Sequence, residues 1–268
     1  MTPALRLRQK LKAWLNDAQQ QKIRQFLALR FRSPQHVVYK LAIGRSLRDL
    51  AIVYGTNKWG DHWYAKHYET HFEALRRRQL NVLEIGIGGD TTPESGGGSL
   101  RMWRTYFPNS RIYGIDIHDK SPHNERRIQT FRGSQADETL LLDVVRRIGR
   151  IDIVIDDGSH RNEHVLKTFA FLFPRLSDTG MYVVEDTQTS YWPEMGGSSR
   201  DLERRDTSMG FFKNLVDGLN HVEFDRDDYE PNYYDKHIVA MHFYHGLVFI
   251  QKGMNNEGSS VRHRWLGG

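Results

Sequence analysis

The sequence of 268 residues contains no cysteine. This absence excludes a disulfide framework, a thiolate zinc site, an iron–sulfur cluster and a cysteine nucleophile. No apolar run is long enough to cross a bilayer, and charged residues interrupt the leucines of residues 1–12. We therefore expect neither a transmembrane segment nor a secretory signal, and we expect a cytoplasmic protein.

Basic charge is concentrated near the N-terminus. Residues 1–50 carry eleven Lys or Arg and two Asp or Glu, although the formal net charge of the whole chain is only +5. Apolar residues at roughly helical spacing predict two amphipathic helices there. Such helices suit peripheral membrane contact, a contact with another subunit, or a helical appendage with a solvated basic face. The remaining residues, 51–268, are mildly acidic overall and show no basic patch of the kind that binds nucleic acid. We therefore interpret them as a separate domain.

From residue 81 onwards, the pattern alternates between strand and helix. Short, nearly apolar runs predict strands at residues 82–86, 111–116, 127–132, 151–156 and 181–185, with helices between them. Runs of this kind are typical of a parallel sheet covered on both faces. Two final runs, at residues 238–243 and 247–251, predict an antiparallel edge. The predicted fold is α/β, a doubly wound, mostly parallel, seven-stranded sheet of the Rossmann-like type.

Glycine and polar residues stand where the predicted strands end, which is where doubly wound sheets bind ligands. A dinucleotide fingerprint would require a glycine at the position of Thr91, so the glycine turn argues against a nicotinamide cofactor. Glu84 lies in the first predicted strand, and Asp116 ends the second. Acidic residues at these positions suit a nucleoside ligand, because a carboxylate accepts hydrogen bonds from ribose hydroxyls. We predict a cofactor site formed by Glu84, Gly86, Gly88, Asp116, Ser134, Gln135, Asp137 and Asp156. For Asp156, a helix cap is an equally good interpretation.

Four acidic residues end two neighbouring strands: Asp156, Asp157, Glu185 and Asp186. Carboxylates that lie close together raise one another's pKa, and a hard divalent cation with oxygen ligands relieves that repulsion. We predict that Asp157, Glu185 and Asp186 bind Mg²⁺, or alternatively Mn²⁺. The competing interpretation is that these acids cap the helices that follow.

His160 comes three residues after Asp157, in the turn that leaves the fourth predicted strand. An imidazole at this position can accept a proton from a substrate hydroxyl, so we predict that His160 is a catalytic base. Tyr191 and Trp192 follow the acidic pair and offer aromatic faces to a substrate such as a sugar. A hydrophobic lid without substrate contact explains these two aromatic residues equally well.

Several of these stretches together resemble the macrolide-sugar and rhamnosyl O-methyltransferases, the mycinamicin and macrocin type. The similarity rests on residues 55–59 (GTNKW), 97–103 (GGSLRMW), 114–117 (GIDI) and 156–160 (DDGSH), and on residues 185–186 (ED) together with 191–193 (YWP). It covers roughly residues 54–197, and the family has a larger, differently composed N-terminal region. The resemblance implies a class I methyltransferase fold, S-adenosylmethionine, Mg²⁺, a sugar hydroxyl as acceptor and a homo-oligomer. It also implies metal ligation by Asp157, Glu185 and Asp186, with His160 as the base.

Three alternatives come from other functional classes. The first is a nicotinamide-dependent oxidoreductase, which Thr91 argues against. The second is an iron-dependent hydroxylase of the cephalosporin-hydroxylase-like kind, on the same fold. The third is a non-catalytic scaffold whose basic N-terminal helices dock on anionic membranes.

Overall fold

The computed structural model describes residues 46–89 and 91–259. The helices predicted within residues 1–45 lie outside this range. The described residues form two compact units, one of residues 46–78 and 96–109, the other of residues 79–95 and 110–259. Within these residues, no helix combines the length and the apolar character that crossing a membrane requires.

The first unit is helical and has an aromatic core. Its elements are α4 (Leu47–Tyr54), α5 (Ala65–Phe72), the short 3₁₀ helix η1 (Glu73–Leu75) and α6 (Gly98–Tyr106). Helix α4 runs across the boundary predicted at residue 50. Helix α6 begins after Gly97, which adopts a left-handed backbone (φ 71°) and makes no side-chain cap. Tyr68 of α5 and Trp103 of α6 pack edge to face, with ring centroids 4.9 Å apart.

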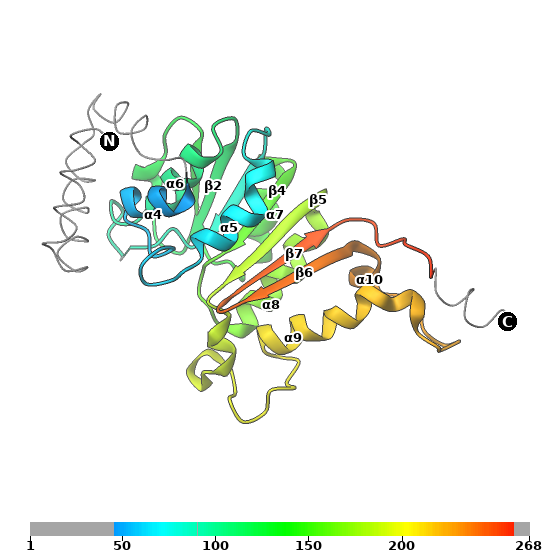
Figure 1. The fold of residues 1–268 in the computed structure, drawn as a ribbon. Helices are drawn as coiled ribbons and strands as arrows, with labels where there is room; N and C mark the ends of the chain where they lie inside the picture. The colour runs from blue at the N-terminus through cyan, green and yellow to red at the C-terminus, as the bar shows by residue number, and fades with distance from the viewer. Residues whose placement is uncertain (1–45, 90, 260–268) are drawn as a thin grey trace, which may run out of the picture. The chain divides into compact units, whose positions relative to one another are not determined.

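The second unit contains a seven-stranded sheet in the order β3-β2-β1-β4-β5-β7-β6. Strands β1 to β5 are parallel, and β7 lies antiparallel between β5 and β6. The predicted fold class is confirmed, including the antiparallel edge (Figure 1). The strands are β1 (Asn81–Ile85), β2 (Arg111–Asp116), β3 (Ile128–Arg132), β4 (Ile151–Asp156), β5 (Leu176–Glu185), β6 (Ile238–Tyr244) and β7 (Leu247–Lys252).

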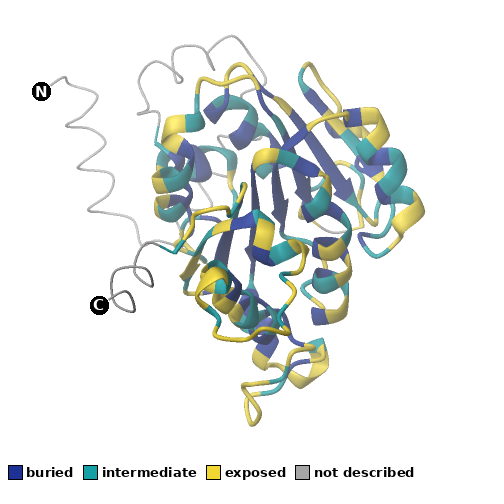
Figure 2. Ribbon diagram, turned by 90° about the vertical axis from the view of Figure 1, so that its right-hand side faces the viewer, coloured by how far each residue is buried: buried dark blue, intermediate teal, exposed yellow. Residues whose placement is uncertain are grey.

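Helices of the second unit pack on this sheet through one continuous core. Every residue of β4 is buried, and Figure 2 shows buried residues along the strands. Phe169 of α8 stacks on Phe173 at 4.9 Å and packs edge to face on Tyr182 of β5 at 5.0 Å. Each fully buried large apolar side chain stabilises the fold by roughly 1.5–3 kcal/mol. The helices are α7 (Glu138–Ile148), α8 (Asn162–Leu172), α9 (Ser208–Val216) and α10 (Tyr233–His237), with 3₁₀ helices η2 (Ser121–His123), η3 (Phe173–Arg175), η4 (Thr187–Tyr191), η5 (Pro193–Met195) and η6 (Asp217–Glu223).

Strand register determines which residues meet at the carboxyl edge of the sheet. Ile85 of β1 pairs with Asp156 of β4, and Asp156 pairs with Val184 of β5. The residues that follow each strand therefore leave the sheet at the same edge, and the glycine turn, the DDGSH turn and the acidic pair lie beside one another.

Candidate functional site

The glycine turn after β1 approaches the backbone of the turn after β4 too closely for any side chain. Gly86 has a φ of 84°, and a Cβ on this residue would collide with the carbonyl group of Asp157. Gly88 also has a positive φ, 74°, but a Cβ there would meet nothing within 4 Å. Only glycine satisfies both the backbone conformation and the contact at residue 86.

Asp116, at the end of β2, binds the backbone of the glycine turn. Its Oδ2 accepts a hydrogen bond from the backbone N–H of Ile87 at 3.0 Å, and its Oδ1 accepts one from that of His118 at 2.9 Å. A carboxylate has about four acceptor positions, so each oxygen retains one for a ligand hydroxyl. The location of Asp116 beside Gly86 and Gly88 agrees with the predicted cofactor site, although its contact with a cofactor stays a prediction.

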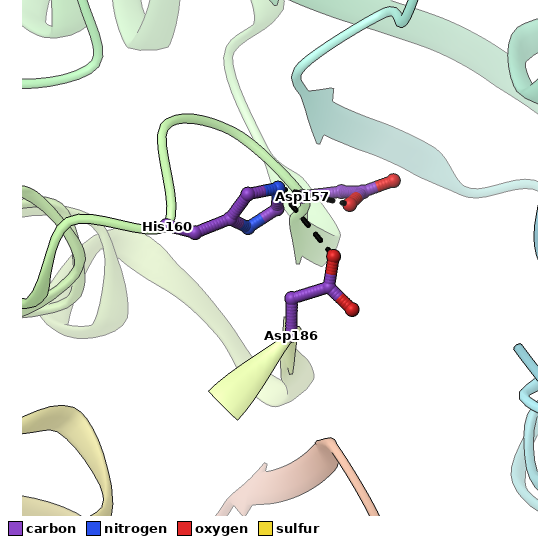
Figure 3. Close-up of side chains that lie close together, drawn as sticks. All are labelled: Asp157, His160 and Asp186. Carbon is purple, nitrogen blue, oxygen red and sulfur yellow. Dashed lines mark ion pairs between the residues drawn. The ribbon is translucent and has the colours of Figure 1, made fainter. Parts of the chain in front are cut away.

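Asp157, His160 and Asp186 converge next to this turn. One potential ligand atom from each residue lies within 4.8 Å of the others. His160 Nε2 lies 3.5 Å from Asp186 Oδ2 and 3.9 Å from Asp157 Oδ1, and the three side chains point toward one another in Figure 3. Glu185 is buried at the end of β5 and is not part of this group, so its role as a metal ligand stays a prediction.

The backbone at two members of this cluster is strained. Among the described residues, three that are not glycine have a positive φ, and two of them are His160 (56°) and Asp186 (53°). This left-handed conformation costs a non-glycine residue roughly 1–2 kcal/mol. Such residues persist only where the surrounding contacts determine their conformation, and they occur preferentially at functional sites. The strain therefore supports a functional role for the cluster.

A buried hydrogen-bond network supports the turn that carries Asp157 and His160. Gln135 donates from Nε2 to Asp156 Oδ1 at 3.0 Å and to Thr168 Oγ1 at 3.1 Å, while its Oε1 accepts from the backbone N–H of Ser159 at 2.6 Å. The hydroxyl of Tyr182 donates to the other oxygen of Asp156 at 3.2 Å. Both Gln135 and Asp156 were predicted to bind the cofactor, and both make these contacts inside the protein; cofactor binding by either residue stays a prediction.

Burial is the main cause of the shifted pKa values of the Asp156 carboxyl and the Tyr182 hydroxyl in this network. It raises the pKa of the Asp156 carboxyl to about 6, although the hydrogen bond from Gln135 acts in the opposite direction. Burial also raises the pKa of the Tyr182 hydroxyl well above its usual value, so this group remains a proton donor. A carboxylate in such a place requires its hydrogen bonds, because an unpaired buried charge is strongly destabilising.

The remaining predicted cofactor residues also have structural contacts. Asp137 is the N-cap of α7 and accepts hydrogen bonds from the backbone of Thr139 and Leu140. Ser134 Oγ accepts from the backbone N–H of Ala136 at 3.2 Å, and Glu84 is fully buried within β1. These contacts explain the residue types at 134 and 137 locally, and cofactor binding by all three residues stays a prediction.

The two predicted substrate aromatics project from a well-supported loop. Tyr191 ends η4, Trp192 separates it from η5, and these side chains are 39% and 44% exposed. Exposed aromatic rings on an ordered loop suit contact with a ligand. Their contact with an acceptor stays a prediction.

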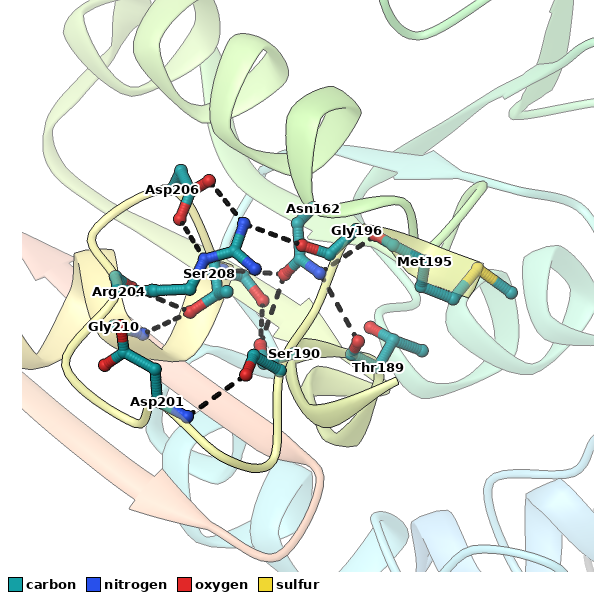
Figure 4. Close-up of polar contacts among 12 residues, drawn as sticks. Asn162, Thr189, Ser190, Met195, Gly196, Asp201, Arg204, Asp206, Ser208 and Gly210 are labelled. Carbon is teal, nitrogen blue, oxygen red and sulfur yellow. Dashed lines mark hydrogen bonds and ion pairs between the residues drawn. The ribbon is translucent and has the colours of Figure 1, made fainter. Parts of the chain in front are cut away.

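Sequence reasoning missed the residue that anchors this loop, Asn162. Its Nδ2 donates to the carbonyl oxygens of Thr189 at 3.3 Å and Met195 at 3.0 Å. Its Oδ1 accepts from the backbone N–H of Ser208 at 2.7 Å and from Ser190 Oγ at 3.3 Å (Figure 4). Asn162 is the first residue of α8, and apolar spacing gives no signal that marks a polar residue at a helix start as the anchor of a loop.

The donor atoms of the cluster suit a hard divalent cation. Carboxylate oxygens are the ligands that Mg²⁺ prefers, and Asp157 and Asp186 present them on adjacent turns. An imidazole nitrogen is a poorer ligand for this ion, so His160 is better suited to proton transfer beside the cation than to ligation.

Comparison with known proteins identifies close relatives of this chain, although no family model matches it. It is 49% identical over 214 residues to mycinamicin VI 2''-O-methyltransferase of Micromonospora griseorubida and 50% identical over 214 residues to demethylmacrocin O-methyltransferase of Streptomyces fradiae. Each alignment covers 79% of this chain and 54% of the relative. A solved structure of the MycE methyltransferase of the mycinamycin biosynthetic pathway, in complex with Mg and SAH, matches with a TM-score of 0.77 and 48% identity. That match covers 80% of this chain and 56% of the solved one, so the chain spans about half the length of the relatives it matches.

Proposed function

Since this chain is homologous to the macrolide-sugar and rhamnosyl O-methyltransferases, we propose that it transfers a methyl group from S-adenosylmethionine to a sugar hydroxyl with the help of a divalent cation. The observation that carries the proposal is the convergence of Asp157, His160 and Asp186 beside the glycine turn. This arrangement places a candidate metal site and a candidate base next to the predicted cofactor loop.

S-adenosylmethionine is the cofactor in this proposal. The turn at Gly86 and Gly88 allows the close approach of a ligand to the backbone, and Asp116 accepts hydrogen bonds from the ribose hydroxyls. The solved relative with SAH, the product that remains after methyl transfer, supports this choice of donor.

Asp157, Glu185 and Asp186 hold Mg²⁺ in this proposal. The bound cation supplies stabilisation of the negative charge that develops on the acceptor oxygen. Asp157 and Asp186 belong to the observed cluster, and Glu185 is the last residue of β5, directly before Asp186. The solved relative that contains Mg supports the choice of ion.

His160 accepts the proton of the acceptor hydroxyl at Nε2. The O–H bond breaks, the oxygen forms a bond to the methyl carbon, and the carbon–sulfur bond breaks to leave S-adenosylhomocysteine. The carboxylate of Asp186, 3.5 Å from Nε2, stabilises the imidazolium that results. Tyr191 and Trp192 offer their exposed rings to the apolar faces of the acceptor.

The acceptor in this proposal is a sugar on a glycosylated natural product. A solved complex of the MycE methyltransferase holds mycinamycin VI together with Mg and SAH, and this complex supports the acceptor class. The proposal also includes a cytoplasmic location and a homo-oligomer. The hydroxylase and nicotinamide alternatives are not favoured, because the curated relatives are named as O-methyltransferases.

The test is methyl transfer from isotopically labelled S-adenosylmethionine. The full chain is incubated with mycinamicin VI and, separately, with extracts that contain glycosylated metabolites, and labelled products are identified by mass spectrometry. We expect labelled product with Mg²⁺, its loss in excess chelator, and its recovery when Mg²⁺ is restored. Transfer that persists in excess chelator would contradict metal assistance, and binding of NAD in place of S-adenosylhomocysteine would contradict the choice of donor.

A further inference from the structure

Gln188 lies two residues after Asp186, in η4, and its side chain reaches back to the Asp186 carboxylate. Its Nε2 donates to Asp186 Oδ1 at 3.1 Å. The other carboxylate oxygen of Asp186, Oδ2, lies 3.5 Å from His160 Nε2. The amide therefore binds one oxygen of the carboxylate and leaves the second directed at the cluster.

The remaining polar atom of this amide has no protein partner. Among the described residues, Gln188 Oε1 is one of three buried side-chain atoms for which no hydrogen bond is found. A buried acceptor left unsatisfied costs roughly 1–3 kcal/mol, and such atoms in native structures call for an explanation such as a bound water or ligand. The opposite orientation of the amide is less favourable, because it would place this carbonyl oxygen against the carboxylate of Asp186.

We propose that Gln188 is a positioning residue for the cation site. Its N–H group orients Asp186 for ligation, and its carbonyl oxygen accepts a hydrogen bond from a water or hydroxyl bound at the cation. The inference rests on the proposed function, in which Asp186 is a metal ligand. Groups that hydrogen-bond to a metal ligand orient it, and their loss typically weakens metal affinity about 10–100-fold.

The experiment measures Mn²⁺ binding by electron paramagnetic resonance in the full chain, without cofactor or acceptor. Gln188→Met keeps the length of the side chain and removes both hydrogen-bonding groups. We expect it to weaken Mn²⁺ binding about 10–100-fold. Gln129→Met is the matched control, because Gln129 is exposed on β3, and we expect it to bind Mn²⁺ like the unchanged protein.

Urea unfolding at increasing Mn²⁺ concentration separates positioning from a purely structural role. Gln188→Met removes the donor to Asp186 together with an unsatisfied carbonyl oxygen, and these two losses have opposite effects on the stability of the metal-free protein. A positioning role predicts that the variant falls further below the unchanged protein as Mn²⁺ is added, because the unchanged protein binds the ion more tightly and gains more stability from it. A purely structural role predicts the same difference at every metal concentration. If Gln188→Met does not fold, Gln188→Ala is measured in its place with Gln129→Ala as its control. The loss of the donor to Asp186 should again weaken Mn²⁺ binding in the first variant and not in the second.

A third variant, Asp186→Asn, distinguishes failure of the inference from failure of the proposed function. If Asp186→Asn abolishes Mn²⁺ binding but Gln188→Met leaves it unchanged, the inference about Gln188 is overturned and the metal site stands. If Asp186→Asn also leaves Mn²⁺ binding unchanged, the metal site is overturned and the inference fails with it.

Discussion

Replacement of Gly86 by alanine tests the contact between the glycine turn and the Asp157 turn, and Gly88→Ala is its matched control. Both glycines have a left-handed backbone, with φ of 84° and 74°. Alanine in this conformation loses roughly 1–2 kcal/mol at either position. A new Cβ meets nothing within 4 Å at residue 88, so we expect Gly88→Ala to lose only this amount of unfolding free energy.

At residue 86 the new methyl group also collides with backbone atoms. It would lie 2.7 Å from the carbonyl carbon of Asp157 and 2.9 Å from the Cα of Gly158, and it would overlap the Asp157 carbonyl oxygen. Overpacking against backbone atoms, which cannot rotate away as a side chain can, adds roughly 1–3 kcal/mol to the loss of unfolding free energy. We therefore expect Gly86→Ala to lower the free energy of unfolding by about 2–5 kcal/mol in all.

The assay is urea unfolding of the metal-free and cofactor-free protein, followed by Mn²⁺ titration of the folded variants. Since relief of the collision displaces the Asp157 backbone, Gly86→Ala should weaken Mn²⁺ binding, whereas Gly88→Ala should not. Equal stability losses and equal metal affinities for the two variants would refute the close approach and its link to the proposed metal site.

Two further variants test the base and the aromatic loop. His160→Ala should reduce turnover about 10²–10⁴-fold, the typical contribution of a general base, with S-adenosylhomocysteine affinity measured by calorimetry nearly unchanged; full turnover would remove the assignment. Asn162→Asp places an oxygen against the carbonyls of Thr189 and Met195, so it should raise the KM for the acceptor and lower the unfolding free energy by about 1–3 kcal/mol. Asn214→Asp, in which the affected contact lies within α9, is the control and should leave that KM unchanged.

Most of the fold could be predicted from the sequence, because strands buried on both faces must be apolar along their whole length. The run at residues 151–156 coincides with β4, and the predicted antiparallel pair coincides with β6 and β7 to within one residue at the ends. Helix starts were less predictable. Gly97 begins α6 through its backbone conformation and Asn162 lies at the start of α8, and neither follows from apolar spacing.

Part of the site was also predictable, since polar residues at the ends of neighbouring parallel strands must lie at one edge of the sheet. That rule predicts that Asp157 and Asp186 lie close together, with His160 beside them, and the structure places the three side chains in one cluster. It could not reveal that Gln135 and Asp156 bind each other inside the protein, because hydrogen-bond partners depend on side-chain rotamers in three dimensions.

The order of apolar and polar residues along the chain by itself determined the sheet, the position of the glycine turn and the edge at which the acids gather. Only the tertiary structure decided that Gly86 touches Asp157, that Asn162 anchors the loop of Trp192, and that Gln188 turns back to Asp186. The physical reason is the range of the interactions. Periodic burial is a local property of the sequence, whereas these contacts join particular atoms whose distances are set by strand register, left-handed backbone conformations and the packing of helices on the sheet.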